Sequence, residues 1–335
     1  MMKKHILTSA LALCAPVFTA YADDAHTTGK PFLSRPDGHG PIGVMGDHMH
    51  KKGDLMLSYR YMRMEMDGTR QGTHSVTPQQ VLGSYMMTPL TMQMDMHMVG
   101  AMYGLTDTIT LMAMVPYIEK KMETLHRNGT RASNKSSGVG DIKATVLKEL
   151  WSDGKHTVHG QAGLTLPTGS IDQSTTTGTP MAYGMQLGSG TWDILGSLTY
   201  TGHTDDLSWG AQGSTMIRTG LNDNGYRLGN TYSATAWLAR PITDNISLSG
   251  RLIGTHTNQI SGRHSRLNAA MMPGADAANS GGNTVDAGFG INFLTPTTPK
   301  GHRLALEATV PVYRNLQGTQ LEKDYTLILG WQKSF

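Results

Sequence analysis

The sequence is poor in the features that define most secreted or membrane-anchored proteins. Its one cysteine, Cys14, falls within the first 22 residues, and no apolar run of about 18 residues follows them. If those residues are a cleaved signal peptide, the mature chain has no disulfide, no thiol nucleophile and no thiolate metal site. Transmembrane helices are excluded as well. The net charge falls from +3 to +1 when Lys3 and Lys4 are removed, so nothing suggests nucleic acid as a partner.

The first residues have the pattern of a secretory signal peptide. Lys3 and Lys4 precede an apolar run over 6–20, and Ala20 and Ala22 form a small-x-small cleavage pattern. The pattern predicts cleavage after Ala22, and Leu13 before Cys14 disfavours lipoprotein processing. Residues 23–53 are irregular, rich in His, Met and Gly, and without periodicity, which predicts a periplasmic leader.

From residue 54 to 335 the chain alternates between apolar and polar residues. In the first such segment Leu57 and Tyr59 alternate with Ser58 and Arg60. A barrel wall needs only one apolar residue in two, so a hydrophobic content of 38% is sufficient. We expect an all-β, transmembrane antiparallel β-barrel of about 12 strands, with periplasmic N- and C-termini. The predicted strands are 54–66, 91–103, 107–122, 138–151, 155–168, 190–202, 206–219, 229–241, 244–256, 284–295, 301–313 and 324–335.

The alternative for this pattern is a soluble periplasmic sandwich or propeller, which also alternates and uses tight turns. A soluble barrel would bury its apolar face. Here the polar face carries bulky charged residues on many strands while the apolar face is nearly unbroken, which favours lipid outside. Long connections near 123–137, 169–189 and 257–283 are predicted to be extracellular and able to gate the mouth.

The final strand ends on an aromatic residue and resembles the outer-membrane insertion signal. A terminal strand of this kind can be recognised by strand addition, which predicts the barrel-assembly machinery as a partner during insertion. Together with the signal peptide it places the chain in the outer membrane of a Gram-negative bacterium, in contact with lipid. The residues of the predicted assembly signal are Tyr325, Leu327, Leu329, Trp331 and Phe335.

Several short motifs, in order along the chain, resemble the meta-pathway phenol-degradation family of outer-membrane transporters. The N-terminal segment is rich in Met and His, which is typical of a subgroup of this family. The resemblance implies a barrel that passes small solutes, including hydrophobic or aromatic compounds, and it implies no catalytic residue and no required cofactor. The motifs are Pro41-Ile42-Gly43-Val44-Met45-Gly46-Asp47-His48-Met49-His50, Leu57-Ser58-Tyr59-Arg60-Tyr61-Met62, Gly138-Val139-Gly140-Asp141, Gly163-Leu164-Thr165-Leu166-Pro167-Thr168-Gly169, Gly188-Ser189-Gly190-Thr191-Trp192-Asp193 and Gly330-Trp331-Gln332.

Charged residues on the polar faces of the strands are candidates for lining the lumen, where they can stay hydrated or paired. The alternative is a salt-bridge network that plugs a narrow barrel, because about a dozen strands leave little room once side chains point inward. Both readings stay open at this point. The candidates are Arg60, Asp95, His97, Lys143, His159, Arg218, Arg251, Asp286 and Glu307.

Methionine is concentrated in one part of the chain, with 16 of 23 between Met45 and Met122. Four of them, at 92, 94, 96 and 98, alternate strictly and therefore share a strand face. Because Asp95 and His97 occupy the other face and would be costly in lipid, we expect these four methionines to face the bilayer.

Other methionines are predicted to point inward, where thioethers could bind copper(I) or silver(I). Histidines just before the barrel add imidazole groups. An outer-membrane metal-binding or efflux-related protein is therefore the alternative function, with copper as a possible bound ion. The candidate metal residues are His39, Met45, His48, Met49, His50, Met56, Met62, Met64, Met112 and Met114.

Catalysis is the least favoured class. Some outer-membrane barrels hydrolyse lipids with a serine and a histidine, and His74-Ser75 and His264-Ser265 are adjacent in the sequence. Neighbouring residues in a strand point to opposite faces, so adjacency does not assemble a site. We therefore expect a channel or transporter-like barrel and no enzyme.

Overall fold

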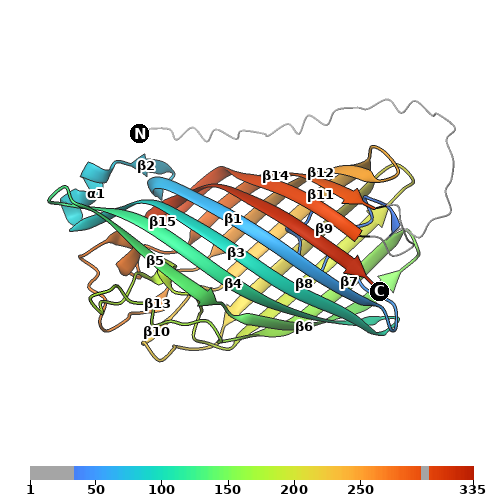
Figure 1. The fold of residues 1–335 in the computed structure, drawn as a ribbon, viewed down its shortest axis with the longest axis horizontal. Coiled ribbons are helices and arrows are strands. Elements are labelled where there is room, and N and C mark those ends of the chain that lie inside the picture. Colours follow the sequence, from blue (N-terminus) through green and yellow to red (C-terminus); the bar gives the residue numbers. More distant parts are fainter. Residues whose placement is uncertain (1–33, 296–301) are drawn as a thin grey trace, which may run out of the picture.

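The computed structural model describes residues 34–295 and 302–335, and the predicted signal peptide lies outside these residues. The fold is a closed antiparallel barrel of tilted strands (Figure 1). The wall strands are β1 (Leu55–Gly72), β3 (Met87–Thr106), β4 (Ile109–His126), β6 (Ile142–Ser152), β7 (His156–Leu166), β8 (Asp193–His203), β9 (Ser208–Arg218), β11 (Thr231–Pro241), β12 (Ile246–Thr257), β14 (Gly282–Leu294) and β15 (His302–Ser334).

The last strand, β15, makes two passes across the wall. Its first part pairs with β14 and its last part pairs with β1, which closes the ring. The two parts lie side by side, because Arg303 contacts Gln332 at 2.5 Å and Arg314 contacts Glu322 at 3.2 Å. The eleven labelled strands therefore make twelve passes in the described chain. This confirms the predicted barrel of about 12 strands.

Short elements gather at the end of the barrel away from the C-terminus (Figure 1). They are β2 (His74–Val76), α1 (Pro78–Ser84), β5 (Arg131–Val139), β10 (Tyr226–Arg227), β13 (Ser261–Gly262), and the 3-10 turns η2 (Tyr183–Met185) and η3 (Pro273–Ala275). Long connections mark this end as extracellular, and the short turns beside Phe335 mark the other end as periplasmic. Within the described ranges no helix has the length and apolar character needed to cross a membrane.

An apolar belt covers the outside of the wall. The belt follows from the two-residue period, because alternate side chains of every strand point away from the interior. On β1 these are Leu57 and Tyr59, and on the final pass Leu329 lies in the same belt. The residues of the predicted assembly signal share this outward face, as expected, and their role in insertion stays a prediction.

Three neighbouring strands, β1, β3 and β4, are 18 to 20 residues long. A transmembrane strand needs only about 9–11 residues, so these strands continue well beyond the bilayer on the extracellular side. The outer face changes there: Arg63, Asp95 and Glu119 replace the apolar residues and lie at matched positions across the three strands. The predicted strands 54–66, 91–103 and 107–122 stop short of the extracellular ends of β1, β3 and β4, because lipid does not select residues above the membrane.

Candidate functional site

The N-terminal segment 34–51 lies inside the barrel and is called the plug below. Strands from all around the wall bind its backbone. Gln212 of β9 donates to Met45 O at 2.9 Å, and Thr110 of β4 accepts from His50 N at 2.9 Å. Ile42 is 1% exposed. Residues 23–53 were predicted to be an irregular periplasmic leader, but residues 34–51 lie inside the barrel, because unpaired backbone groups in this irregular segment find partners in the polar lumen.

Four of the predicted lumen residues hold the plug in place. Arg60 Nε donates to Ile42 O at 3.1 Å, and the carboxylate of Glu307 accepts from Gly43 N at 2.7 Å. Glu307 also forms an ion pair with Arg251, with Nε and Oε1 2.8 Å apart. His159 Nε2 lies 2.8 Å from Gly46 O. These side chains thus bind mainly the backbone of the plug, and the pair of Arg251 with Glu307 is the one ion pair among them.

The other inward candidates lie higher in the barrel. Arg218 pairs with Asp193, and Lys323 pairs with Asp286 at 2.5 Å. Lys143 and Arg218 line a cavity in the extracellular half. Arg218 and Asp286 are thus paired with other wall residues, and Arg218 also borders the cavity.

Asp95 and His97 lie on the outer surface, so their assignment to the lumen was wrong. Tyr61 donates to Asp95 at 2.5 Å, and Tyr59, which is exposed in the belt, lies 2.7 Å from His97 Nδ1. The physical reason is strand length. This part of β3 stands at or above the edge of the bilayer, where charged groups remain hydrated and carry no lipid penalty.

The methionines at 92, 94, 96 and 98 point inward, which corrects their assignment to the bilayer. The prediction identified the alternation correctly, but it assigned the methionines to the outer face and Asp95 and His97 to the inner face. Val99 and Tyr103, on the same face as Asp95, are 59% and 44% exposed and belong to the belt. Inside, the four methionines face the neighbouring inward methionines of β1 and β4 and the loops that fold over the mouth.

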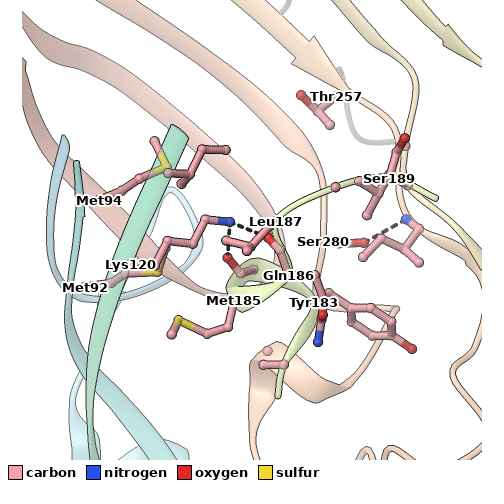
Figure 2. A pocket seen from close by; sticks show the side chains of 18 of the residues that line it. Met92, Met94, Lys120, Tyr183, Met185, Gln186, Leu187, Ser189, Thr257 and Ser280 are labelled. Atoms are coloured by element: carbon pink, nitrogen blue, oxygen red, sulfur yellow. Dashed lines mark hydrogen bonds between the residues drawn. The ribbon is translucent and has the colours of Figure 1, made fainter. Parts of the chain in front are cut away.

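A cavity of about 600 Å³ occupies the extracellular half, and methionine is the most frequent residue type in its lining. Figure 2 shows Met92 and Met94 on the wall beside Lys120, whose ammonium donates to Gly184 O and Gln186 O. Those carbonyls belong to the loop that carries Met185. The lining methionines are Met64, Met66, Met92, Met94, Met96, Met98, Met114, Met122, Met185, Met216 and Met272.

A second cavity of about 980 Å³ opens on the periplasmic side of the plug. Met49 and Met56 line it, whereas Met98 and Met114 line the upper cavity. One buried cluster contains all four, so on the side of β1, β3 and β4 thioethers lie between the two spaces, beside the plug. This cluster, called the methionine septum below, consists of Met45, Met49, Met56, Met96, Met98, Met102, Met112, Met114 and Leu147.

The candidate metal residues do not converge on one place. Met45, Met49, Met56, Met112 and Met114 lie in the methionine septum. Met62 packs beside Ile42, and Met64 lines the upper cavity. His39, His48 and His50 instead gather around Asp47 at the periplasmic face of the plug.

Two groups of this histidine cluster have shifted pKa values. Burial, reinforced by the neighbouring His48, holds the pKa of His39 well below its usual value, so its imidazole is neutral at neutral pH. Burial alone would raise the pKa of Asp47, but the attraction and hydrogen bond of His48 outweigh it, and the pKa lies below its usual value. Asp47 is therefore a carboxylate.

Several residues of the site were not among the candidates. Arg303 binds Gly40 O at 2.6 Å, and its inward position follows from alternation along β15. Lys120 could have been found in the same way on β4. Met185, which is fully buried, lies in a loop without periodicity, so the sequence contains no signal for it.

A sequence model of the family described as "Putative MetA-pathway of phenol degradation" matches residues 69–308. The chain belongs to this family. No curated protein sequence matches the chain significantly. The match confirms the resemblance seen in the motifs of the barrel.

Solved structures resemble the fold of this family member. An outer membrane channel from Pseudomonas putida F1 has a TM-score of 0.62 at 15% identity, covering 88% of this chain and 100% of that one. A FadL homologue of Pseudomonas aeruginosa gives 0.40 at 10% identity, covering 90% and 94%. The transport unit of the Escherichia coli autotransporter AIDA-I gives 0.46 at 10%, covering 91% and 99%. The first of these supports an outer-membrane barrel as the fold.

Proposed function

We propose that the protein is an outer-membrane channel that takes small apolar solutes, with monoaromatic compounds as the model class. The observation that carries this proposal is the methionine-lined cavity in the extracellular half. Thioether side chains are apolar, flexible and polarisable, and they make favourable contacts with aromatic rings. A volume of about 600 Å³ accommodates a small aromatic molecule with room to move.

The position of the cavity supports a route toward the periplasm. Met96, Met98 and Met114 of the methionine septum line this cavity, and Met49 and Met56 of the same cluster line the periplasmic cavity. Unbranched methionines can change rotamer without breaking hydrogen bonds, so an apolar solute can displace them at small cost. Methionines of β1, β3 and β4 pack together in this cluster, and the plug itself contributes Met45 and Met49.

Uptake of radiolabelled toluene tests the proposal in Gram-negative cells that lack their own aromatic channel. The informative variant is Met94→Gln, which keeps the shape of a lining residue but places an amide in the cavity. An amide without a partner costs about 1–3 kcal/mol, so uptake should fall about fivefold or more. Met86→Gln is the matched control, because Met86 is 46% exposed and outside the lining. Equal uptake by both variants would refute the proposal.

Copper(I) is the second candidate cargo, because soft thioethers follow one another from the plug to the mouth. Met94→Leu separates the two candidates, since leucine keeps the cavity apolar but has no sulfur. A solute channel keeps its toluene uptake in this variant. A copper(I) route instead loses copper(I)-dependent conductance in planar bilayers under reducing conditions, while wild type retains it.

A further inference from the structure

A cluster of imidazole and carboxylate groups lies in the plug, well apart from the methionine-lined cavity. His48 is its centre. Its Nδ1 lies 3.3 Å from His39 Nδ1 and 2.9 Å from Asp47 Oδ1, and its Nε2 lies 3.2 Å from His50 Nε2. A single nitrogen of His48 thus faces both another ring nitrogen and a carboxylate, although it can carry only one proton. Lone pairs that converge in this way form an arrangement that a metal ion can bind.

The spacing of three of these groups fits one metal ion. Ligands at 2.0–2.1 Å from a tetrahedral ion lie about 3.3 Å from one another. The distances observed are 3.3 Å from His39 Nδ1 to His48 Nδ1, 2.9 Å from His48 Nδ1 to Asp47 Oδ1, and 3.8 Å from His39 Nδ1 to the other oxygen of the same carboxylate, Oδ2. One donor atom from each of the three residues lies within 4.8 Å of the others. No backbone movement is needed to bring the set together.

The surroundings orient each ligand. Asp47 Oδ2 accepts from Gly40 N at 2.8 Å, which joins the two limbs of the plug and fixes the carboxylate. His50, on the far side of His48, can accept the Nε2 proton of His48 and leave its Nδ1 free to bind the ion. The cluster lines the periplasmic cavity, so an ion has a path to it, and three protein ligands leave a position for water.

We propose that His39, Asp47 and His48 bind one divalent first-row transition-metal ion of the Zn²⁺ or Cu²⁺ type, with His50 as a positioning residue. Imidazole and carboxylate donors favour these ions over Ca²⁺ and Mg²⁺. The site differs from a copper(I) route, which would use thioethers. The bound ion cross-links residues 39 and 47–48 and so stabilises the plug in its place. This proposal does not depend on what passes through the upper cavity.

The test is calorimetric titration of the tag-free, refolded mature protein, treated with chelator, using ZnCl₂ and CuCl₂ separately. We expect one ion per chain for the ion that is bound. His48→Ala should remove this binding, and His50→Ala should weaken it by about 10- to 100-fold, the usual effect of losing a partner of a ligating histidine. His74→Ala is the matched control, because His74 is exposed at the opposite end and should change nothing. Absence of one-to-one binding of either ion, or wild-type binding by His48→Ala, would overturn the proposal.

A second measurement does not depend on a variant folding. Co²⁺ bound to wild type in a tetrahedral nitrogen and oxygen site should give intense visible ligand-field bands that Zn²⁺ abolishes by displacement. A weak spectrum like that of hydrated Co²⁺, unchanged by Zn²⁺, would contradict the proposed site. Circular dichroism and the heat-dependent gel mobility of each variant show whether the barrel has formed.

Discussion

The periplasmic and extracellular halves of the barrel interior are closed by different chemistry. Below, the plug is fixed by directed polar contacts such as Gly43 N to Glu307 and Arg60 to Ile42 O. Above, loops fold into the mouth and pack methionines such as Met181, Met185 and Met272 against the wall. Buried polar contacts fail sharply when one partner is lost, whereas apolar packing can adjust. The comparison indicates a rigid lower half and an adaptable upper half.

The two halves meet at the methionine septum. The plug contributes Met45 and Met49 to it, so the polar lower half presents an apolar surface upward. A solute that reaches the septum from the upper cavity meets the thioethers of Met96, Met98 and Met114. Changes in one half should therefore leave the contacts of the other half largely intact.

The largest effect is expected from Glu307→Gln, which leaves the Arg251 guanidinium buried without its carboxylate. Breaking a buried pair in this way costs about 3–5 kcal/mol, enough to release the plug. Planar-bilayer recordings should show frequent openings and larger conductance steps than wild type. Glu65→Gln is the control, because its pair with Arg63 is partly exposed and worth about 1 kcal/mol or less. Identical recordings for the two variants would show that the pair does not hold the plug.

An intermediate effect is expected from Met185→Ala in the upper half. Met185 is fully buried in the loop cluster, and removing its side chain should cost about 2–5 kcal/mol of local stability. Faster amide hydrogen exchange over 181–187, with unchanged exchange over 40–48, would show that the local stability of the upper half is independent of the plug. Met271→Ala, at an exposed position, should change neither segment. Equal acceleration in the plug would show that the halves are one cooperative unit.

The smallest effect concerns His264 in the extracellular loop before η3. Burial, with repulsion by Arg266, lowers its pKa, and its Nδ1 accepts from Arg266 N at 3.1 Å. The open loop therefore binds a proton more readily than the closed loop. Closure should be complete above the usual histidine pKa of about 6.5 and weaken as pH falls below it.

Amide exchange over 260–275 at pH 7.5 and 5.5, corrected for intrinsic rates, measures this weakening. His264→Gln retains an acceptor near Arg266 N but cannot take up the proton, so its loop should respond less to pH. A wild-type loop whose corrected exchange is the same at both pH values would contradict the role of His264.

Much of the wall could be read from the sequence, because lipid imposes the simple rule that outward residues are apolar. On β1 the alternation of Leu57 and Tyr59 with Ser58 and Arg60 placed each side chain on its correct face. The order of the wall strands around the barrel is their order along the chain. The C-terminal strand indicated the outer membrane, and the family motifs indicated the class of barrel.

Beyond the bilayer and inside the barrel, only the tertiary structure decides which side chains face inward and what they contact. Period-2 alternation in β3 separates Met94 from Asp95 but does not say which faces inward, and above the bilayer no lipid answers that question. The plug has no periodicity at all, so its place depends on contacts far apart in the sequence, such as Gly43 with Glu307. The sequence thus determined a membrane barrel through local alternation. Folding decided what fills it, because lumen contacts join segments that have no local pattern.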